Sequence, residues 1–203
     1  MTADLQALRR RLQGRTPGLL GAGSSYAVLC PLTETAEGLS LLFEVRAKGL
    51  RQGGEVCFPG GRMEAGESQI QCALRETAEE LSIPAAEVEV LGLTDFICNQ
   101  RGFLLHPVLG IVSAAGMAAL RPSPAEVAEA FAVPVRFFRE TPPVVRRYAL
   151  VPQIPEDFPY EAAGVAPDYP WASGEVEVPI WRWGDWPIWG MTARIVRDIV
   201  KML

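Results

Sequence analysis

Three glutamates at helical spacing are the residues of this chain best suited to chemistry. Glu79 and Glu80 follow Glu76 by three and four positions, so on a helix the three carboxylates project into one patch. Like charges at this spacing cost helix stability, roughly 0.2–0.5 kcal/mol per pair, and a cation is expected to compensate them. Because the ligand atoms are all oxygens, the pattern favours Mg²⁺ or Mn²⁺ over zinc. The alternative is a solvated acidic face without a ligand.

A helix from Ser68 to about Ser82 is predicted to position these carboxylates. Its apolar positions recur at helical intervals and predict one buried face, made of Ile70, Leu74, Thr77, Ala78 and Leu81. Ser68 is suited to cap the N-terminus, and Gln71 completes a capping-box pattern. Pro84 disfavours helical geometry at Ile83, so the helix is expected to stop there.

The longer stretch around this helix resembles the Nudix box. The resemblance rests on Gly61, five residues, Glu67, seven residues and then residues 75–83, which read Arg-Glu-Thr-Ala-Glu-Glu-Leu-Ser-Ile. The sequence departs from the box at Thr77, where an aliphatic residue is usual, and at Ser82, where the family normally has Gly. A left-handed backbone at Ser82 would be strained. Neither departure removes a carboxylate, so the resemblance implies a competent box.

The acidic patch favours pyrophosphate chemistry, which needs charge neutralised on both phosphoryl groups and a water placed in line. On this interpretation Glu76 and Glu80, with Glu79, ligate one or more Mg²⁺ or Mn²⁺ ions. Arg75 is expected to pair with a neighbouring carboxylate and orient it. Glu67, at the start of the helix, is the candidate partner and has a structural role.

The identity of the general base stays open between several residues. In the family that the box resembles, a Glu commonly activates the water, and the candidates are Glu79, Glu80 and Glu126. Glu126 is equally well explained as a capping-box residue of a short helix that begins at Ser123. The single histidine, His106, lies in an apolar strand and is better explained as a structural or half-exposed residue.

The flanks of the box resemble the extra signature of coenzyme A pyrophosphatases within the Nudix family. The matching residues are Leu41-Leu42, Arg46-Ala47, Leu50-Arg51, Gly54, Val56, Phe58-Pro59-Gly60-Gly61, Pro107-Val108, Gly110-Ile111-Val112, Glu126-Val127, Phe131, Val133-Pro134 and residues 189–193. This resemblance implies hydrolysis of coenzyme A or acyl-CoA to 3′,5′-ADP and the corresponding 4′-phosphopantetheine.

Substrate contacts are expected from a basic loop and from two glycines. Arg46, Lys48 and Arg51 would serve the 3′-phosphate and the pyrophosphate, with a solvated basic loop as the alternative. Gly60 and Gly61 allow close backbone approach. Two competing functions remain: a Nudix pyrophosphatase acting on ADP-ribose, NADH or an oxidised nucleotide, and a non-catalytic nucleotide-binding module.

Composition narrows the class of protein. The 203 residues are 49% hydrophobic and carry a net charge of −5, so a buried core is expected and general attraction to nucleic acid or anionic membranes is not. Four cysteines form no Cys-x-x-Cys pair, as is usual for reduced thiols. No apolar run reaches transmembrane length and no signal-peptide core precedes the first strand, so a cytoplasmic location is expected.

The pattern of elements predicts one α/β domain over residues 1–203. Residues 1–24 are expected to hold a short helix (3–13) and a lead-in. Strands are predicted at 25–32, 38–46, 55–58, 88–96, 104–112, 144–151 and 176–183, with helical segments at 123–131, 135–139 and 190–203. A Pro-rich excursion fills 152–178, and the segment from Trp171 to Trp189 either walls the pantetheine arm or forms a homodimer surface. The resemblance implies a Nudix-type α/β/α sandwich with a mixed β-sheet.

Overall fold

A mixed β-sheet forms the centre of the computed structural model, which describes residues 2–15, 18–21 and 23–203. Its strands are β1 (Ser24–Thr35), β2 (Gly38–Arg46), β3 (Val56–Cys57), β4 (Gly60–Arg62), β5 (Val88–Leu93), β6 (Ile97–Cys98), β7 (Phe103–Val112) and β8 (Val127–Pro134). The path is β3-β2-β1-β7-β5, and β4, β6 and β8 pair with β1, β7 and β2. The β1–β7 pairing is parallel and the other pairings are antiparallel.

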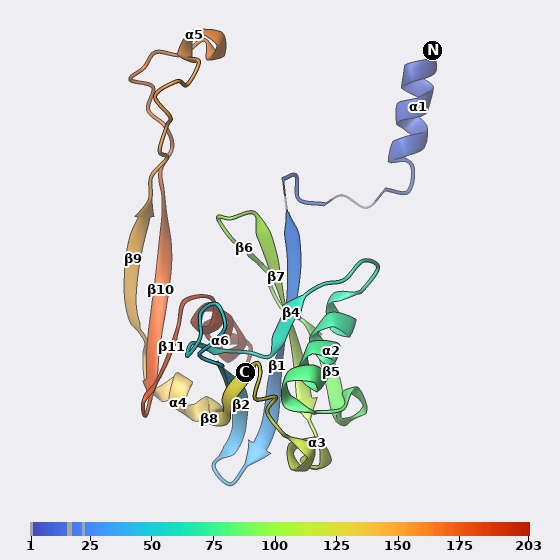
Figure 1. The fold of residues 1–203 in the computed structure, drawn as a ribbon, viewed down its shortest axis with the longest axis vertical. Coiled ribbons are helices and arrows are strands. Elements are labelled where there is room, and N and C mark those ends of the chain that lie inside the picture. The colour runs from blue at the N-terminus through green and yellow to red at the C-terminus, as the bar shows by residue number, and fades with distance from the viewer. Residues whose placement is uncertain (1, 16–17, 22) are drawn as a thin grey trace.

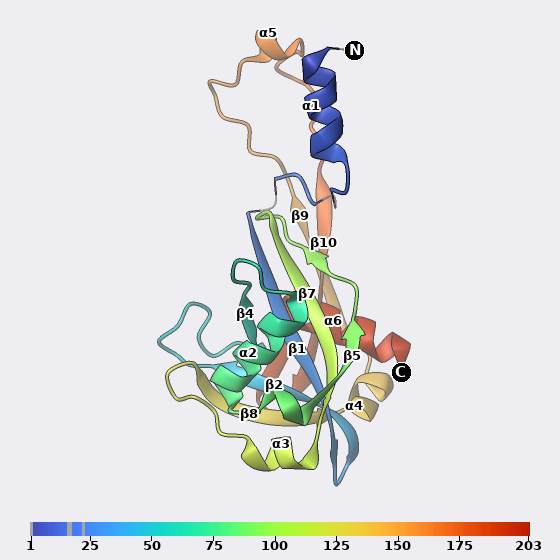
Figure 2. The same ribbon diagram turned by 90° about the vertical axis from the view of Figure 1, so that its right-hand side faces the viewer.

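Helices cover both faces of this sheet. The helical elements are α1 (Ala3–Leu12), α2 (Gln69–Leu81), the 3-10 turn η1 (Ala85–Glu87), α3 (Ala114–Ala119), α4 (Val135–Glu140), α5 (Tyr160–Ala163) and α6 (Gly190–Met202), and of these α1 and α5 lie away from the sheet (Figure 1). Figures 1 and 2 show α2 and α6 on opposite sides of the sheet. The expected α/β/α sandwich is therefore confirmed.

Alternating side chains of β2 feed two separate cores. Phe43 packs with Phe138 of α4 and Ile199 of α6 in one core cluster. Leu42 packs with Leu81 of α2 in the other cluster. This alternation is what a strand buried on both faces requires.

A second sheet of three strands carries an arm that leaves the body. It consists of β9 (Val144–Leu150), β10 (Gly174–Trp183) and β11 (Trp186–Trp189), in the order β11-β10-β9. The β9–β10 hairpin reaches away from the main sheet, and α5 lies at its far end (Figure 1). At this end Phe158 packs edge-on against Trp171, with ring centroids 5.3 Å apart. The strands expected at 144–151 and 176–183 are present, and β11 is an addition to the prediction.

The prediction of a helix that begins at Ser123 is wrong. Residues 124–126 form a turn, in which the Val127 amide donates to the Ser123 carbonyl at 2.8 Å. The chain then becomes β8, which pairs along β2 with Phe131 opposite Phe43. Sheet pairing to an available strand edge thus outweighs the local capping signal.

The N-terminal segment agrees with the prediction where it is described. Helix α1 spans Ala3–Leu12, and the Thr2 side chain accepts a hydrogen bond from the Leu5 amide. The predicted lead-in over 1–24 includes residues 1, 16, 17 and 22, which lie outside the described residues. Among the described helices, none is both long enough and apolar enough to cross a membrane.

Candidate active site

Both ends of α2 are fixed by the residues that the sequence singles out. The Ser68 side chain accepts from the Gln71 amide at 3.3 Å, and the Gln71 side chain accepts from the Ser68 amide at 2.9 Å, which completes the predicted capping box. At the C-terminus Ser82 adopts the left-handed conformation, with φ 60° and ψ 23°. Its hydroxyl donates to the Arg121 carbonyl at 3.0 Å, which anchors a residue in strained geometry.

The three helix glutamates do not share one exposed patch. Glu80 is buried at 3% exposure, the Glu76 side chain is 16% exposed, and the Glu79 side chain is 56% exposed. At about 100° per residue, Glu80 and Glu79 lie on opposite sides of Glu76, roughly 40° and 60° from it. The carboxylates therefore run from the interior to solvent, and the alternative of a solvated acidic face does not hold for Glu80.

Arg75 connects the acidic residues of the motif. Its Nε donates to Glu67 Oε1 at 2.9 Å, as predicted, and its Nη1 donates to Glu76 at 2.9 Å and Glu79 at 3.1 Å. These bonds lower the pKa of Glu67 to about 2 and raise the pKa of Arg75. Arg75 thus orients carboxylates from the start and the middle of the helix.

Gly60 and Gly61 begin strand β4, where the sequence predicted a loop, and this glycine pair lies directly against the acidic helix. The Gly60 amide donates to Glu80 Oε2 at 2.8 Å. A Cβ on Gly61 would collide with the Glu76 carboxylate, and a Cβ on Gly60 would collide with the Ala27 carbonyl. Glycine at position 61 therefore permits close approach to the Glu76 carboxylate, and glycine at position 60 permits close approach to β1.

Glu44 is a carboxylate that the sequence analysis missed. It lies on β2 with no solvent exposure, and its Oε1 accepts from the Cys57 thiol at 3.3 Å. Burial raises the pKa of Glu44 to about 7. Burial and the charge of Glu44 together raise the pKa of Glu80 to about 8. A glutamate within the apolar run Leu-Leu-Phe-Glu-Val of a predicted strand was the signal that could have revealed it.

The donor set at α2 fits a divalent cation. Burial raises the pKa of Glu76, the charges of Glu79 and Glu126 add to this rise, and the ion pair with Arg75 opposes it. Throughout the described ranges, no group of three or more His, Cys, Asp and Glu side chains is gathered as a metal site. Two existing contacts account for this arrangement, since Arg75 holds Glu76 and the Gly60 amide holds Glu80.

A pocket of about 600 Å³ opens beside the glycine pair Gly60–Gly61. Its basic lining residues are Arg46, Arg51, Arg101 and Arg194, and its aromatic ones are Tyr26, Phe58, Phe103, Tyr148 and Trp189. Arg46 and Arg51 were expected there, whereas Lys48 is exposed and lies outside the described lining. Arg101 and Arg194 were not predicted, because they come from the β6–β7 connection and from α6.

Glu126 and His106, the two other residues considered for the general base, lie outside α2. Glu126 is exposed in the turn before β8, and its charge raises the pKa of Glu44 and Glu76. Its explanation as a helix cap is wrong, because no helix begins there. His106 is half-buried on β7 against the Phe96 ring, with centroids 5.5 Å apart, and burial lowers its pKa.

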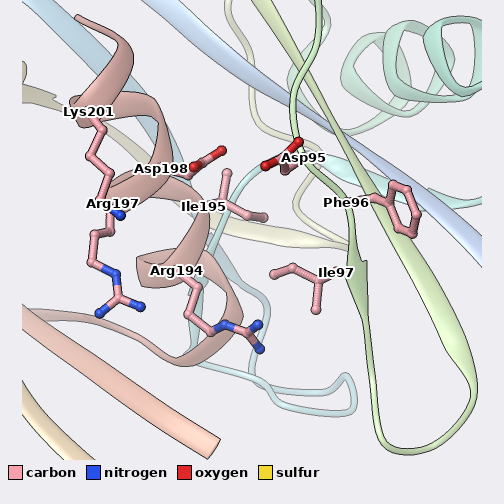
Figure 3. A pocket seen from close by; sticks show the side chains of 8 residues that line it. All are labelled: Asp95, Phe96, Ile97, Arg194, Ile195, Arg197, Asp198 and Lys201. Carbon is pink, nitrogen blue, oxygen red and sulfur yellow. The ribbon is translucent and has the colours of Figure 1, made fainter.

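A second, smaller pocket of about 180 Å³ lies between α6 and the segment that joins β5 to β6. Figure 3 shows its side chains: Asp95, Phe96, Ile97, Arg194, Ile195, Arg197, Asp198 and Lys201. Its lining includes two acidic side chains, Asp95 and Asp198, and three basic ones, of which Arg197 is paired with Glu177 at 3.1 Å. It contains neither the acidic helix nor the glycine pair.

Comparison with known proteins agrees with this geometry. The NUDIX domain family matches residues 24–148. Human mitochondrial coenzyme A diphosphatase NUDT8 is 37% identical over 136 residues, which cover 66% of this chain and 58% of that protein. The mouse protein of the same name is 28% identical over 203 residues, which cover 98% of this chain and 88% of that protein.

Peroxisomal coenzyme A diphosphatase NUDT7 of mouse is 35% identical over 120 residues, covering 58% of this chain and 50% of that protein. The chain thus spans about half the length of several curated relatives that it matches.

The solved structure of the Nudix hydrolase RenU from M. smegmatis superposes with a TM-score of 0.50 at 21% identity, covering 58% of this chain and 74% of that one. That likeness concerns the fold alone. The match to the family covers more than half of the chain and includes α2, the glycine pair and β2. The chain therefore belongs to the NUDIX domain family.

Proposed function

We propose that this protein is a metal-dependent pyrophosphohydrolase that cleaves coenzyme A or acyl-CoA to 3′,5′-ADP and the corresponding 4′-phosphopantetheine. One observation carries the proposal. The carboxylates of Glu76 and Glu80 lie against the glycine pair Gly60–Gly61 of β4, and this pair also lines a pocket with four arginines. Acidic groups suited to a cation thus adjoin basic groups suited to phosphates.

The residues of α2 divide the work between binding and orientation. Glu76 and Glu80, with Glu79, would hold Mg²⁺ or Mn²⁺, which when bound supplies charge neutralisation at the two phosphoryl groups. Arg75 orients Glu76 and Glu79 through its two 2.9–3.1 Å bonds. Glu79 and Glu126 are the candidates for accepting the proton of the attacking water, since both residues are exposed to solvent.

The pocket supports a large anionic substrate. Its volume of about 600 Å³ is typical of sites for cofactor-sized ligands. Arg46 and Arg51 line the pocket and would bind the pyrophosphate and the 3′-phosphate, and Arg101 and Arg194 would add two further cations. The curated relatives named coenzyme A diphosphatases support the same substrate class.

Other substrates of the same reaction type remain alternatives, namely ADP-ribose, NADH and oxidised nucleotides. A non-catalytic nucleotide-binding module is the alternative outside hydrolysis, and the complete set of motif glutamates argues against it. A cytoplasmic location stays a prediction, because the relatives carry mitochondrial and peroxisomal names. A homodimer also stays a prediction.

Product formation on a panel of substrates tests the proposal. The panel is coenzyme A, acetyl-CoA, ADP-ribose, NADH and 8-oxo-dGTP, each assayed with and without Mg²⁺. We expect 3′,5′-ADP from the two coenzyme A compounds at the highest kcat/KM, and only in the presence of the metal. A higher efficiency on another pyrophosphate would refute the coenzyme A assignment, and no turnover of any compound by folded protein would refute hydrolysis.

A further inference from the structure

One carboxylate oxygen of Glu44 is buried and has no hydrogen-bond partner among the described residues. The Glu44 side chain has no solvent exposure, and its Oε1 accepts from Cys57 at 3.3 Å. Its Oε2 is the single buried side-chain oxygen or nitrogen within residues 2–15, 18–21 and 23–203 that has no hydrogen-bond partner. Because buried polar groups are normally satisfied, this oxygen requires a partner.

The strand geometry directs this side chain towards α2. Leu42 packs in the core cluster that contains Leu81 of α2, whereas Phe43 packs in the cluster of α4 and α6. Side chains two residues apart on a strand share a face, so Glu44 lies on the same face as Leu42. Its electrostatic influence on Glu80 agrees with that placement.

Among the described residues, Glu44 also has no ion-pair partner on this face, although the charge of Arg46, two residues further along β2, opposes the rise of its pKa. It forms no ion pair with any described Lys, Arg or His side chain within 4.0 Å. Protonation does not remove the problem, because a protonated Oε2 would need an acceptor just as an ionised one needs a donor or a cation. The neighbouring acidic residues, Glu80 and Glu76, can supply neither a donor nor positive charge when ionised.

We propose that Glu44 Oε2 is an additional oxygen ligand of the divalent cation held by Glu76 and Glu80, so that the site takes a carboxylate from the sheet as well as from the helix. This inference rests on the proposed metal-dependent function. It places a fourth carboxylate on the interior side of the site, opposite the exposed Glu79. Oxygen ligands of this kind suit Mg²⁺ and Mn²⁺.

Calorimetric titration of the full chain with MnCl₂ tests the proposal without an activity readout. Glu44→Gln keeps the shape of the side chain and removes its charge, and we expect it to weaken Mn²⁺ binding at least about tenfold. Glu44→Asp keeps the charge but withdraws the carboxylate, and we expect a similar loss. Glu89→Gln, on the exposed side of β5, is the matched control and should bind as the wild type does.

The outcomes separate this inference from the function on which it rests. Thermal unfolding without metal should show both Glu44 variants folded, with a Tm equal to or above that of the wild type for Glu44→Gln. Wild-type Mn²⁺ affinity in Glu44→Gln, or in Glu44→Asp, would overturn the ligand role while the metal site of the wild type stands. Absence of Mn²⁺ binding by the wild type would overturn the metal site and the ligand role together.

Discussion

Glu80 combines burial with charge, and this combination determines how the site responds to pH. Its carboxylate is 3% exposed, accepts one hydrogen bond from the Gly60 amide and lies near a second buried carboxylate, that of Glu44. A stability role would be better served by an apolar residue at either position. Burial of these two carboxylates therefore lowers the free energy of unfolding when they are ionised, and this loss should be measurable.

Stability of the metal-free protein should fall as pH rises. Glu44 and Glu80 have folded-state pKa values raised to about 7 and about 8, above the ordinary carboxyl value of about 4.3. Between these limits the folded state binds more protons than the unfolded state, so the free energy of unfolding decreases with pH. At about 1.36 kcal/mol per pKa unit, these values give a loss on the order of 6 kcal/mol between pH 5 and pH 8, measured by urea unfolding in EDTA.

Two comparisons control this prediction. Saturating Mn²⁺ should flatten the decline, because a bound cation compensates the ionised carboxylates, and Glu44→Gln should flatten it without metal. A free energy of unfolding that rises from pH 5 to pH 8 in EDTA would contradict the assigned pKa directions.

Arg51 tests the substrate at the level of one side chain. It lines the pocket from the loop after β2 and is exposed, so its replacement leaves the core intact. We expect Arg51→Ala to raise KM for coenzyme A about tenfold, through loss of one charge-assisted contact, and to change KM for 3′-dephospho-CoA less than twofold. Equal losses on both substrates would remove Arg51 from the 3′-phosphate. Arg136→Ala, which loses only a surface pair with Glu37, is the matched control.

At the scale of elements, α2 was the most predictable part of the fold. Its limits follow from local signals, the Ser68–Gln71 capping box and the stop before Pro84, and these act within a few residues. The burial of Glu80 was not predictable in the same way, because it depends on how far the helix is rotated against the sheet. Gly60 and Gly61 of β4 fix that rotation through their contacts with Glu80 and Glu76, which lie about 15–20 positions later in the chain.

The error at Ser123 has a similar cause. The local sequence carries a helix-start signal, yet the following residues complete the sheet as β8 beside β2. The partner strand lies more than 80 positions earlier in the chain, as in the pairing of Phe43 with Phe131. Local propensity cannot report a contact of that range. The same reason hides Arg101 and Arg194 from a sequence-based site prediction, whereas Glu44 carries a local signal as a charged residue within an apolar strand.

Ser82 provides a stability test of the helix C-terminus. Its left-handed backbone, with φ 60°, is one that glycine adopts without strain. Ser82→Gly and Ser82→Ala both lose the hydroxyl bond to Arg121, so the difference between them isolates the backbone term. We expect Ser82→Gly to be more stable than Ser82→Ala by about 1 kcal/mol in urea unfolding. Equal stability of the two variants would show that the position is not strained.

On the scale of the whole molecule, the body and the arm have separate packing. Neither core cluster of the described chain includes a residue between 139 and 180. The far end of the arm is held by its own aromatic residues, with Tyr169 and Phe158 both packed on Trp171. The base of the arm is different, because Tyr148 and Glu177 line the large pocket. Residues 171–189 were expected either to wall the pantetheine arm or to form a homodimer surface. The two ends of this segment differ, because Trp189 lines the pocket and Trp171 lies at the far end of the arm.

Shortening the arm tests this division. Replacing residues 152–172 by a four-residue Gly-Ser-rich turn removes the far end and keeps β9 and β10 as a hairpin. We expect the Tm of the body to change by less than about 3 °C and kcat/KM for coenzyme A to stay within about threefold, because the removed residues contact neither core. Loss of cooperative unfolding, or a tenfold loss of kcat/KM, would contradict the separation.

The most direct test of the central claim is release of 3′,5′-ADP from coenzyme A by the wild type, Glu80→Gln and Glu89→Gln, each with and without Mg²⁺. Glu80→Gln keeps the shape of a buried side chain at the proposed cation site, so it should remain folded with an unchanged or higher Tm. We expect Mg²⁺-dependent release by the wild type and by Glu89→Gln, and a loss of at least about 100-fold in Glu80→Gln. Turnover near the wild-type rate in folded Glu80→Gln would contradict the assignment of α2 as the catalytic metal site.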